Sequence, residues 1–289
     1  MLVATAWLSA AAHAVLIPGG NGAVTVEIEG IPVEVFTYKP RDYRDGPLLF
    51  VFHGVNRNAE SYRGYARALA ERFGMLVAAP RFDRERFPNW RYQSGGVARA
   101  AKKTESGPLA LEPQRQWTGY LILKLVDQIR GAAGRPDMPF YLLGHSAGGQ
   151  ALSRFAAFFS SDARRIVITN PSSYVFPDRS MIFPYGFGGL PQELASDAVL
   201  RRYLAQPVTI FLGAEDASAK NTDMRPNAMR QGETRYRRGL NAYRAAHALA
   251  RARGWEFGWR LVEAPGIGHS APRMFAAAQA EAALLGERK

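Results

Sequence analysis

The chain has 289 residues, no cysteine and a formal net charge of +12. The lack of cysteine excludes a disulfide scaffold, a thiolate nucleophile and a cysteine-ligated metal. Arginine supplies nearly all of the positive charge, since only six of the 37 basic residues are lysine. Solvated helix faces or attraction to an anionic polymer or surface would each account for this balance, whereas no zinc-type or RNA-binding motif points to nucleic acid.

The first fourteen residues are apolar and end in Ala12-His13-Ala14, a small-x-small pattern typical of a signal-peptide cleavage site. We therefore expect a secretory leader over 1–14 and a secreted or periplasmic protein. The segment lacks a basic start, so an ordinary N-terminal helix and a cytoplasmic protein remain the alternative. No stretch of the sequence is long and apolar enough to predict a transmembrane helix.

In chain order, hydrophobic periodicity predicts an antiparallel hairpin over 23–30 and 31–38, a strand over 47–54, a helix over 59–73, a strand over 75–80 and a loop-like region over 81–110. The pattern continues with a helix over 114–130, a strand over 140–144, a helix over 147–159, a strand over 165–170 and an irregular aromatic segment over 171–205. The last elements are a strand over 208–213, a helix over 233–253, a strand over 257–264 and a helix over 271–285. This alternation predicts one domain over 15–289, in which helices cover both faces of a mostly parallel sheet and the segments 81–110 and 171–205 form loops near the site.

The segment GHSAGG (144–149) follows a short apolar strand and precedes a helix. A strand, a sharp turn and a helix lift a serine hydroxyl above the end of a sheet, next to a helix N-terminus. Gly144 and Gly148 flank the turn, where a side chain would block the contact between strand and helix. We therefore predict that Ser146 is a nucleophile that forms an acyl-enzyme.

A serine nucleophile requires a base, and His269 is the strongest candidate among the five histidines. It lies in a glycine-rich loop directly after the last predicted strand, where a side chain reaches into a site at the carboxyl ends of strands. His247 lies within a helix, His53 is expected to shape its loop, and His145 is expected to point away from the hydroxyl. His13 belongs to the predicted leader.

The base requires an acid that orients its ring and stabilises the imidazolium. Asp216 follows the strand 208–213 and is our first candidate. Glu215 is the rival and Asp223 a more distant alternative. We expect the oxyanion hole to consist of the Val55 and Ala147 N–H groups, with Gly54 allowing the backbone to turn towards the substrate.

The long aromatic loop supplies candidate walls for a substrate pocket, and His145 is a further candidate. The loop residues are Tyr174, Phe176, Phe183 and Tyr185. Aromatic side chains in such a loop are equally typical of ordinary packing. Four arginines are candidates to hold a substrate carboxylate: Arg57, Arg81, Arg91 and Arg179.

Four segments together resemble the α/β-hydrolase superfamily over nearly the whole chain: FHGVNRNAESY (52–62), GHSAGGQ (144–150), LGAED (212–216) and PGIGHSAPRMF (265–275). The order Ser146, Asp216, His269 is the nucleophile–acid–base order of that superfamily. More narrowly, the chain is similar to secreted esterases and polyhydroxybutyrate-depolymerase-like serine hydrolases, and poly(aspartic acid) hydrolases share the same broad fold. The resemblance implies cleavage of an ester or amide through an acyl-enzyme, without a metal or an organic cofactor.

Three functions follow from these observations. The first is a secreted serine hydrolase that cleaves a carboxylic ester, acting on a small molecule or a polymer. The second is a serine peptidase or amidase that degrades an anionic polymer such as poly(aspartate). The third is a non-catalytic protein that binds a polymer or a surface. The sequence does not predict an oligomeric state.

Overall fold

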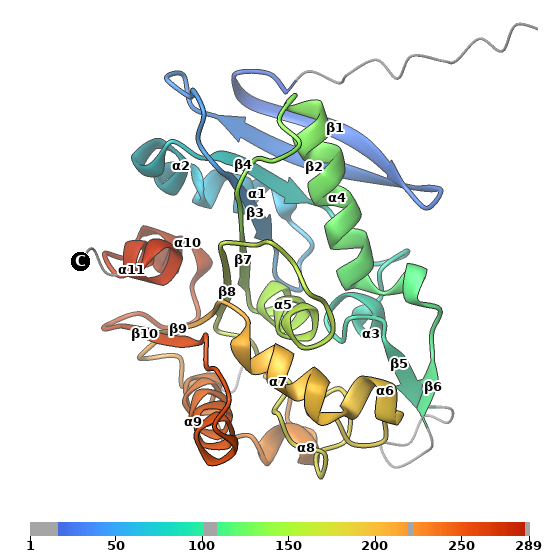
Figure 1. Cartoon of the computed structure of the whole chain (residues 1–289). Coiled ribbons are helices and arrows are strands. Elements are labelled where there is room, and N and C mark those ends of the chain that lie inside the picture. Colours follow the sequence, from blue (N-terminus) through green and yellow to red (C-terminus); the bar gives the residue numbers. More distant parts are fainter. Residues whose placement is uncertain (1–16, 101–108, 219–221, 287–289) are drawn as a thin grey trace, which may run out of the picture.

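The computed structural model describes residues 17–100, 109–218 and 222–286, so the predicted leader lies outside the described residues. Eight strands form the main sheet in the order β1-β2-β4-β3-β7-β8-β9-β10 (Figure 1). The strands are β1 (Gly20–Ile28), β2 (Ile31–Lys39), β3 (Leu48–Phe52), β4 (Leu76–Pro80), β7 (Phe140–His145), β8 (Arg165–Thr169), β9 (Val208–Gly213) and β10 (Arg260–Ala264). β1 pairs antiparallel with β2, and β2 pairs antiparallel with β4, whereas all later pairs are parallel. This topology confirms the predicted hairpin and mostly parallel sheet.

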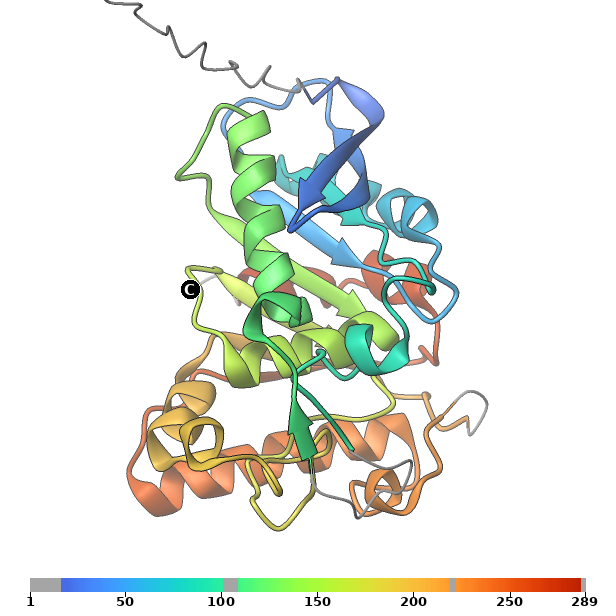
Figure 2. The ribbon, with the colours of Figure 1, turned by 90° about the vertical axis from the view of Figure 1, so that its right-hand side faces the viewer.

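Helices cover both faces of the sheet (Figures 1 and 2). On one face lie α4 (Thr118–Ala132), α5 (Ala147–Phe158), α7 (Asp197–Ala205) and α9 (Arg235–Arg253), and on the other lie α1 (Ala59–Tyr65), α2 (Arg67–Phe73), α10 (Ala271–Ala276) and α11 (Ala280–Leu285). β3 shows why two cores form, because alternate side chains of a strand point to opposite faces. Phe50 and Phe52 belong to the core beneath α4, α5, α7 and α9. Leu49 and Val51 belong to the core beneath α1, α2, α10 and α11.

The parallel strands carry their carboxyl ends to one edge of the sheet, where loops gather residues from distant parts of the sequence. β7 is a central strand, flanked by β3 and β8. The turns that follow β3, β7, β9 and β10 therefore open at the same edge. No helix in the described part of the chain is long and apolar enough to cross a membrane.

Three predicted segments differ from the structure. The helix predicted over 59–73 is divided at Ala66 into α1 and α2, although the Ala66 N–H still donates to the Tyr62 carbonyl oxygen and the Ala70 N–H to that of Ala66. The final helix is interrupted at Ala277, whose backbone is extended. The irregular character expected of 171–205 is wrong for its end, which forms α6 (Gln192–Ala195) and α7. Ser196 caps α7 by accepting a hydrogen bond from the Val199 N–H, a local signal for a helix start.

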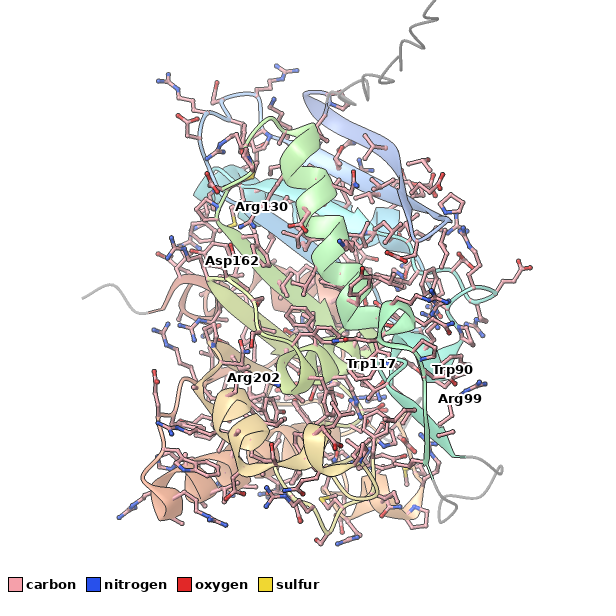
Figure 3. All side chains as sticks on the ribbon, turned by 45° about the vertical axis from the view of Figure 1, so that its right-hand side comes forward. Trp90, Arg99, Trp117, Arg130, Asp162 and Arg202 are labelled. Atoms are coloured by element: carbon pink, nitrogen blue, oxygen red, sulfur yellow. The ribbon has the colours of Figure 1, made fainter. Side chains whose placement is uncertain are left out.

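The loop-like region 81–110 also contains regular structure. It includes α3 (Asn89–Tyr92) and the first strand of a small hairpin, β5 (Ala98–Ala100) with β6 (Leu109–Leu111). Figure 3 shows Arg99 of β5 beside Trp90 of α3, with the guanidinium carbon 4.3 Å from the ring centroid. This cation–π contact ties the hairpin to α3. The remaining short helix is α8 (Pro226–Met229), and a 3₁₀ turn at Gln114–Gln116 precedes α4.

Candidate active site

Ser146 stands at a sharp turn between β7 and α5. Its φ of 56° and ψ of −115° are strained for a residue with a side chain, and its N–H donates a 2.9 Å hydrogen bond to the Thr169 carbonyl oxygen. The flanking residues must be glycines because other backbone atoms lie where their side chains would be. A Cβ on Gly144 would lie 2.5 Å from the Gly148 carbonyl group, and one on Gly148 would lie 2.3 Å from the Phe52 carbonyl oxygen. The sequence GHSAGG thus forms the predicted elbow.

Three predicted residues meet above this turn. The His269 Nε2 lies 3.1 Å from the Ser146 Oγ, and the His269 Nδ1 lies 2.7 Å from the Asp216 Oδ2. The Asp216 side chain is fully buried, and the His269 side chain is about one quarter exposed. Because a carboxylate only accepts hydrogen bonds, Nδ1 carries the ring proton and Nε2 is left to accept the proton of Ser146. This geometry suits abstraction of the serine proton.

The two other candidate acids, Glu215 and Asp223, have no hydrogen bond to His269 and contact solvent or other side chains. Glu215 is exposed to solvent, and the Asp223 carboxylate accepts hydrogen bonds from Tyr185 and Arg225. Asp216 also has a partner that sequence reasoning missed. Arg235, the first residue of α9, donates a 3.1 Å hydrogen bond from Nη1 to the Asp216 Oδ1, and its side chain is 1% exposed. One arginine among several in TRYRR (234–238) carries no local signal for this role.

The remaining described histidines have separate roles. Burial lowers the pKa of His53 to about 3, so its ring stays neutral, and its Nε2 accepts a hydrogen bond from the Phe82 N–H. Its Nδ1 lies 2.9 Å from the Gly54 carbonyl oxygen, in the loop after β3 that His53 was expected to shape. His247 lies exposed on α9.

His145 precedes the nucleophile and contacts the candidate base. Its ring centroid lies 4.7 Å from that of His269, and its Nδ1 is hydrogen-bonded to the Tyr62 hydroxyl at 3.2 Å. Burial, with smaller contributions from His269 and Arg235, lowers the pKa of His145 well below its usual value. A neutral ring therefore lies against His269. The Tyr62 contact joins α1 to the elbow and was not foreseen from the sequence.

The oxyanion hole was predicted to consist of two backbone N–H groups, those of Ala147 and Val55. Ala147 begins α5, and the first N–H groups of a helix lack partners within the helix. Val55 follows Gly54 beyond the end of β3 and faces the cleft. A Cβ on Gly54 would lie 2.9 Å from the Tyr62 hydroxyl and 3.8 Å from the Ser146 Cβ, so the backbone approaches the nucleophile closely at this position.

An open cleft of about 300 Å³ leads to Ser146 and His269. Its other walls come from the loop after β3, from α1, from His145 and from the start of α10: Gly54, Val55, Asn56, Asn58, Tyr62, Tyr65, Ser270, Ala271 and Pro272. None of these walls carries an acidic side chain, a lysine or an arginine. His145 was predicted to line the pocket, whereas the asparagines and Tyr65 were not singled out by the sequence.

The predicted aromatic walls lie elsewhere. Tyr174, Phe183 and Tyr185 are all at most 4% exposed and belong to the core that α4, α5, α7 and α9 cover. Phe176 belongs to the same core. The loop 171–191 therefore uses its aromatic residues for packing, which corrects the expectation that they line this cleft.

The four arginines considered as carboxylate ligands are engaged within the protein. Arg57 donates to the carbonyl oxygens of Phe82 and Phe87, and its guanidinium lies over the Tyr92 ring. The other three are bonded as follows: Arg81 to Glu34, Arg91 to the carbonyl oxygens of Gln116 and Arg86, and Arg179 to Asp197 and the Ala195 carbonyl oxygen. None of the four lines the cleft.

Comparisons with known proteins agree with this fold. Poly(aspartic acid) hydrolase-1 from Sphingomonas sp. KT-1 superimposes with a TM-score of 0.82 at 30% identity, over 91% of this chain and 98% of that chain. A poly(3-hydroxybutyrate) depolymerase from Bordetella parapertussis gives 0.82 at 33% identity, over 92% of this chain and 90% of that chain. An S-formylglutathione hydrolase from Agrobacterium tumefaciens shares the fold at 18% identity, with a TM-score of 0.53, over 89% of this chain and 90% of that chain.

No family model matches the chain, and no curated protein sequence matches it significantly. The extent of the structural matches nevertheless defines the class. The chain belongs to the α/β-hydrolase superfamily of serine hydrolases. Within it, the chain is similar to the poly(aspartic acid) hydrolase and the poly(3-hydroxybutyrate) depolymerase described above.

Proposed function

We propose that the protein is a serine hydrolase that cleaves a carboxylic ester through an acyl-enzyme on Ser146. The single observation that carries the proposal is the continuous hydrogen-bonded chain from the Ser146 Oγ through His269 to the buried Asp216 carboxylate. This chain ends at an elbow whose strained serine lies beside a helix N-terminus and an open cleft.

Each group has a defined task in this mechanism. The His269 Nε2 accepts the proton of Ser146 as the Oγ attacks the carbonyl carbon of the ester, and Asp216 stabilises the resulting imidazolium. The Ala147 and Val55 N–H groups donate hydrogen bonds to the oxyanion of the tetrahedral intermediate. The intermediate collapses, and the alcohol leaves with the proton from His269. In the second half of the reaction His269 takes a proton from water, which attacks the carbonyl carbon of the acyl-enzyme. The Ser146 Oγ then leaves with that proton, and the carboxylic acid is released.

The lining of the cleft favours a neutral substrate segment near the nucleophile. Its polar side chains are amides and hydroxyls, including Asn56, Asn58 and Tyr65. Such groups match ester carbonyls, whereas a carboxylate would be better matched by an arginine fork. The likeness to the poly(3-hydroxybutyrate) depolymerase supports an ester substrate as well.

Amide cleavage in an anionic polymer is the second candidate function. The net charge of +12 and the likeness to poly(aspartic acid) hydrolase-1 favour it. The two candidates share the acyl-enzyme and differ in the leaving group and in the charge of the substrate.

Paired substrates separate the two candidates. We expect turnover of a chromogenic acyl ester and at least a hundredfold slower turnover of an anilide with the same acyl group. Faster cleavage of the anilide, or of poly(aspartate), would favour the amidase. Added salt should slow hydrolysis of poly(aspartate) but not of the neutral ester if the surface charge recruits the polymer.

We also propose that the protein is exported after removal of residues 1–14. The proposal is supported by the apolar start and by the small residues at Ala12 and Ala14. Sequencing the N-terminus of the mature protein tests it. A mature chain that begins at Val15 is expected, and recovery of the intact chain from the cytoplasm would contradict it.

A further inference from the structure

Arg235 gives the candidate acid a second charged partner that a serine–histidine–acid site does not itself require. The two oxygens of the Asp216 carboxylate are bonded separately, Oδ1 to the Arg235 Nη1 at 3.1 Å and Oδ2 to the His269 Nδ1 at 2.7 Å. Both members of the Asp216–Arg235 pair are buried, with side chains 0% and 1% exposed. The rotation of the carboxylate is therefore fixed from both sides.

The backbone around the pair holds Arg235 in place. Thr234 caps α9 by accepting a hydrogen bond from the Arg237 N–H, and the Tyr236 N–H donates to the Asp216 carbonyl oxygen at 3.3 Å. The Arg235 Nη1 also donates to the Ser218 carbonyl oxygen at 3.0 Å. The first turn of α9 thus holds the loop that carries Asp216, and α9 itself packs against β9, the strand before that loop.

The charge of Arg235 affects the proton balance at His269. A lone buried carboxylate strongly favours the imidazolium, which cannot accept the serine proton. A guanidinium on the other oxygen offsets part of that negative charge. Among the described residues, the other charged or titratable groups near His269 include neutral His145 with its partner Tyr62, exposed Glu215, and Arg273 of α10, which donates to the Gly266 carbonyl oxygen.

We propose that Arg235 is a positioning residue of the hydrolytic site, which orients the Asp216 carboxylate and keeps His269 in its base form at more acidic pH. The inference rests on the proposed function. It predicts that loss of the positive charge makes His269 easier to protonate, so that activity is lost at a higher pH.

The test measures the rate at which a fluorophosphonate probe labels Ser146 as a function of pH. In Arg235→Gln, we expect the acid limb of the profile to move to higher pH by about one unit, so that labelling at pH 5 falls about tenfold relative to labelling at pH 8. Arg235→Lys retains the charge, so its acid limb should stay within a few tenths of a unit of the wild-type position.

Arg238 provides a matched control on the same turn of α9. Its side chain is also fully buried, but it donates to the carbonyl oxygens of Gly232 and Ser172 and not to Asp216. Arg238→Gln therefore removes a buried arginine from the same helix without changing the charge beside the acid. We expect it to lower the thermal unfolding temperature and to leave the acid limb where it is in the wild type.

The outcomes are distinguishable. An unshifted acid limb in folded Arg235→Gln overturns this inference, while absence of labelling in the wild type at every pH overturns the proposed function instead. If Arg235→Gln does not fold, the comparison passes to Arg235→Met, which also removes the charge but places no polar group in the buried site. Its acid limb should lie at higher pH than that of Arg235→Lys, and coincident profiles overturn the inference.

Discussion

Substitution of Asp216 by asparagine should disable the site, because the two carboxylate oxygens serve two different donors. An asparagine side chain has one oxygen and one NH₂ group. If its oxygen faces the Arg235 Nη1, its NH₂ group faces the His269 Nδ1. The imidazole must then accept at Nδ1 and carry its proton on Nε2, 3.1 Å from the Ser146 Oγ, where it can no longer accept the serine proton.

The alternative orientation of the asparagine is also unfavourable. It keeps the His269 hydrogen bond but places the NH₂ group against a buried guanidinium, where two donors meet without an acceptor. We therefore expect kcat to fall by about four orders of magnitude, the usual consequence of holding the histidine in the wrong tautomer. That loss corresponds to about 5.4 kcal/mol of transition-state stabilisation, at about 1.36 kcal/mol for each factor of ten.

The assay is steady-state hydrolysis of a chromogenic ester, with circular dichroism to show that each variant is folded. Glu215→Gln is the matched control, because Glu215 is the neighbouring acid and its side chain is exposed. We expect its kcat to remain within about threefold of the wild type, as for most exposed polar substitutions. A larger loss in Glu215→Gln than in Asp216→Asn would refute the reasoning and move the acid role to Glu215.

Two further predictions concern stability. Gly148→Ala places a Cβ 2.3 Å from the Phe52 carbonyl oxygen and should lower the free energy of unfolding, measured in urea, by about 1–3 kcal/mol. The control is Gly131→Ala on α4, whose Cβ would meet nothing within 4 Å and should not destabilise the protein. Equal effects of the two substitutions would contradict the packing argument. Because burial lowers the pKa of His53 from 6.5 to about 3, the unfolded chain takes up a proton in this window that the folded protein does not, and stability falls as the pH falls. Between pH 7 and pH 4.5 the proton taken up by the unfolded chain should lower the stability of the wild type by about 3 kcal/mol, at about 1.4 kcal/mol for each of the two pH units below 6.5. His53→Gln should therefore lose less stability over the same range, and an identical loss would contradict a neutral buried His53.

The parts of the molecule that could be predicted from the sequence are those encoded by short runs of neighbouring residues. The parallel strands β3, β4 and β7 are largely apolar runs, and the elbow is contained in six residues, 144–149, whose glycines are required by local contacts. The histidine loop 265–269 directly follows β10. The relation of Ser146, Asp216 and His269 then follows from the parallel sheet, which brings the ends of β7, β9 and β10 to one edge.

The parts that could not be predicted depend on contacts between segments far apart in the chain. Arg235 meets Asp216 because α9 packs beside β9, and Tyr62 meets His145 because α1 lies over β3, which pairs with β7. Aromatic content alone did not distinguish cleft walls from core, since Tyr174 and Tyr185 are buried by elements that are distant in sequence. α7 was missed although its Ser196 cap is a local signal, because the aromatic residues before it dominated the pattern.

The most direct test of the account is covalent labelling of the nucleophile. The wild-type protein is treated with a fluorophosphonate probe, digested and analysed by mass spectrometry, with Ser146→Ala treated in parallel and both assayed on the chromogenic ester. We predict one modification, on Ser146, and a loss of ester hydrolysis of about three orders of magnitude or more in the folded variant. Labelling at another residue, or near-normal hydrolysis by Ser146→Ala, would contradict the central claim that the protein acts through an acyl-enzyme on Ser146.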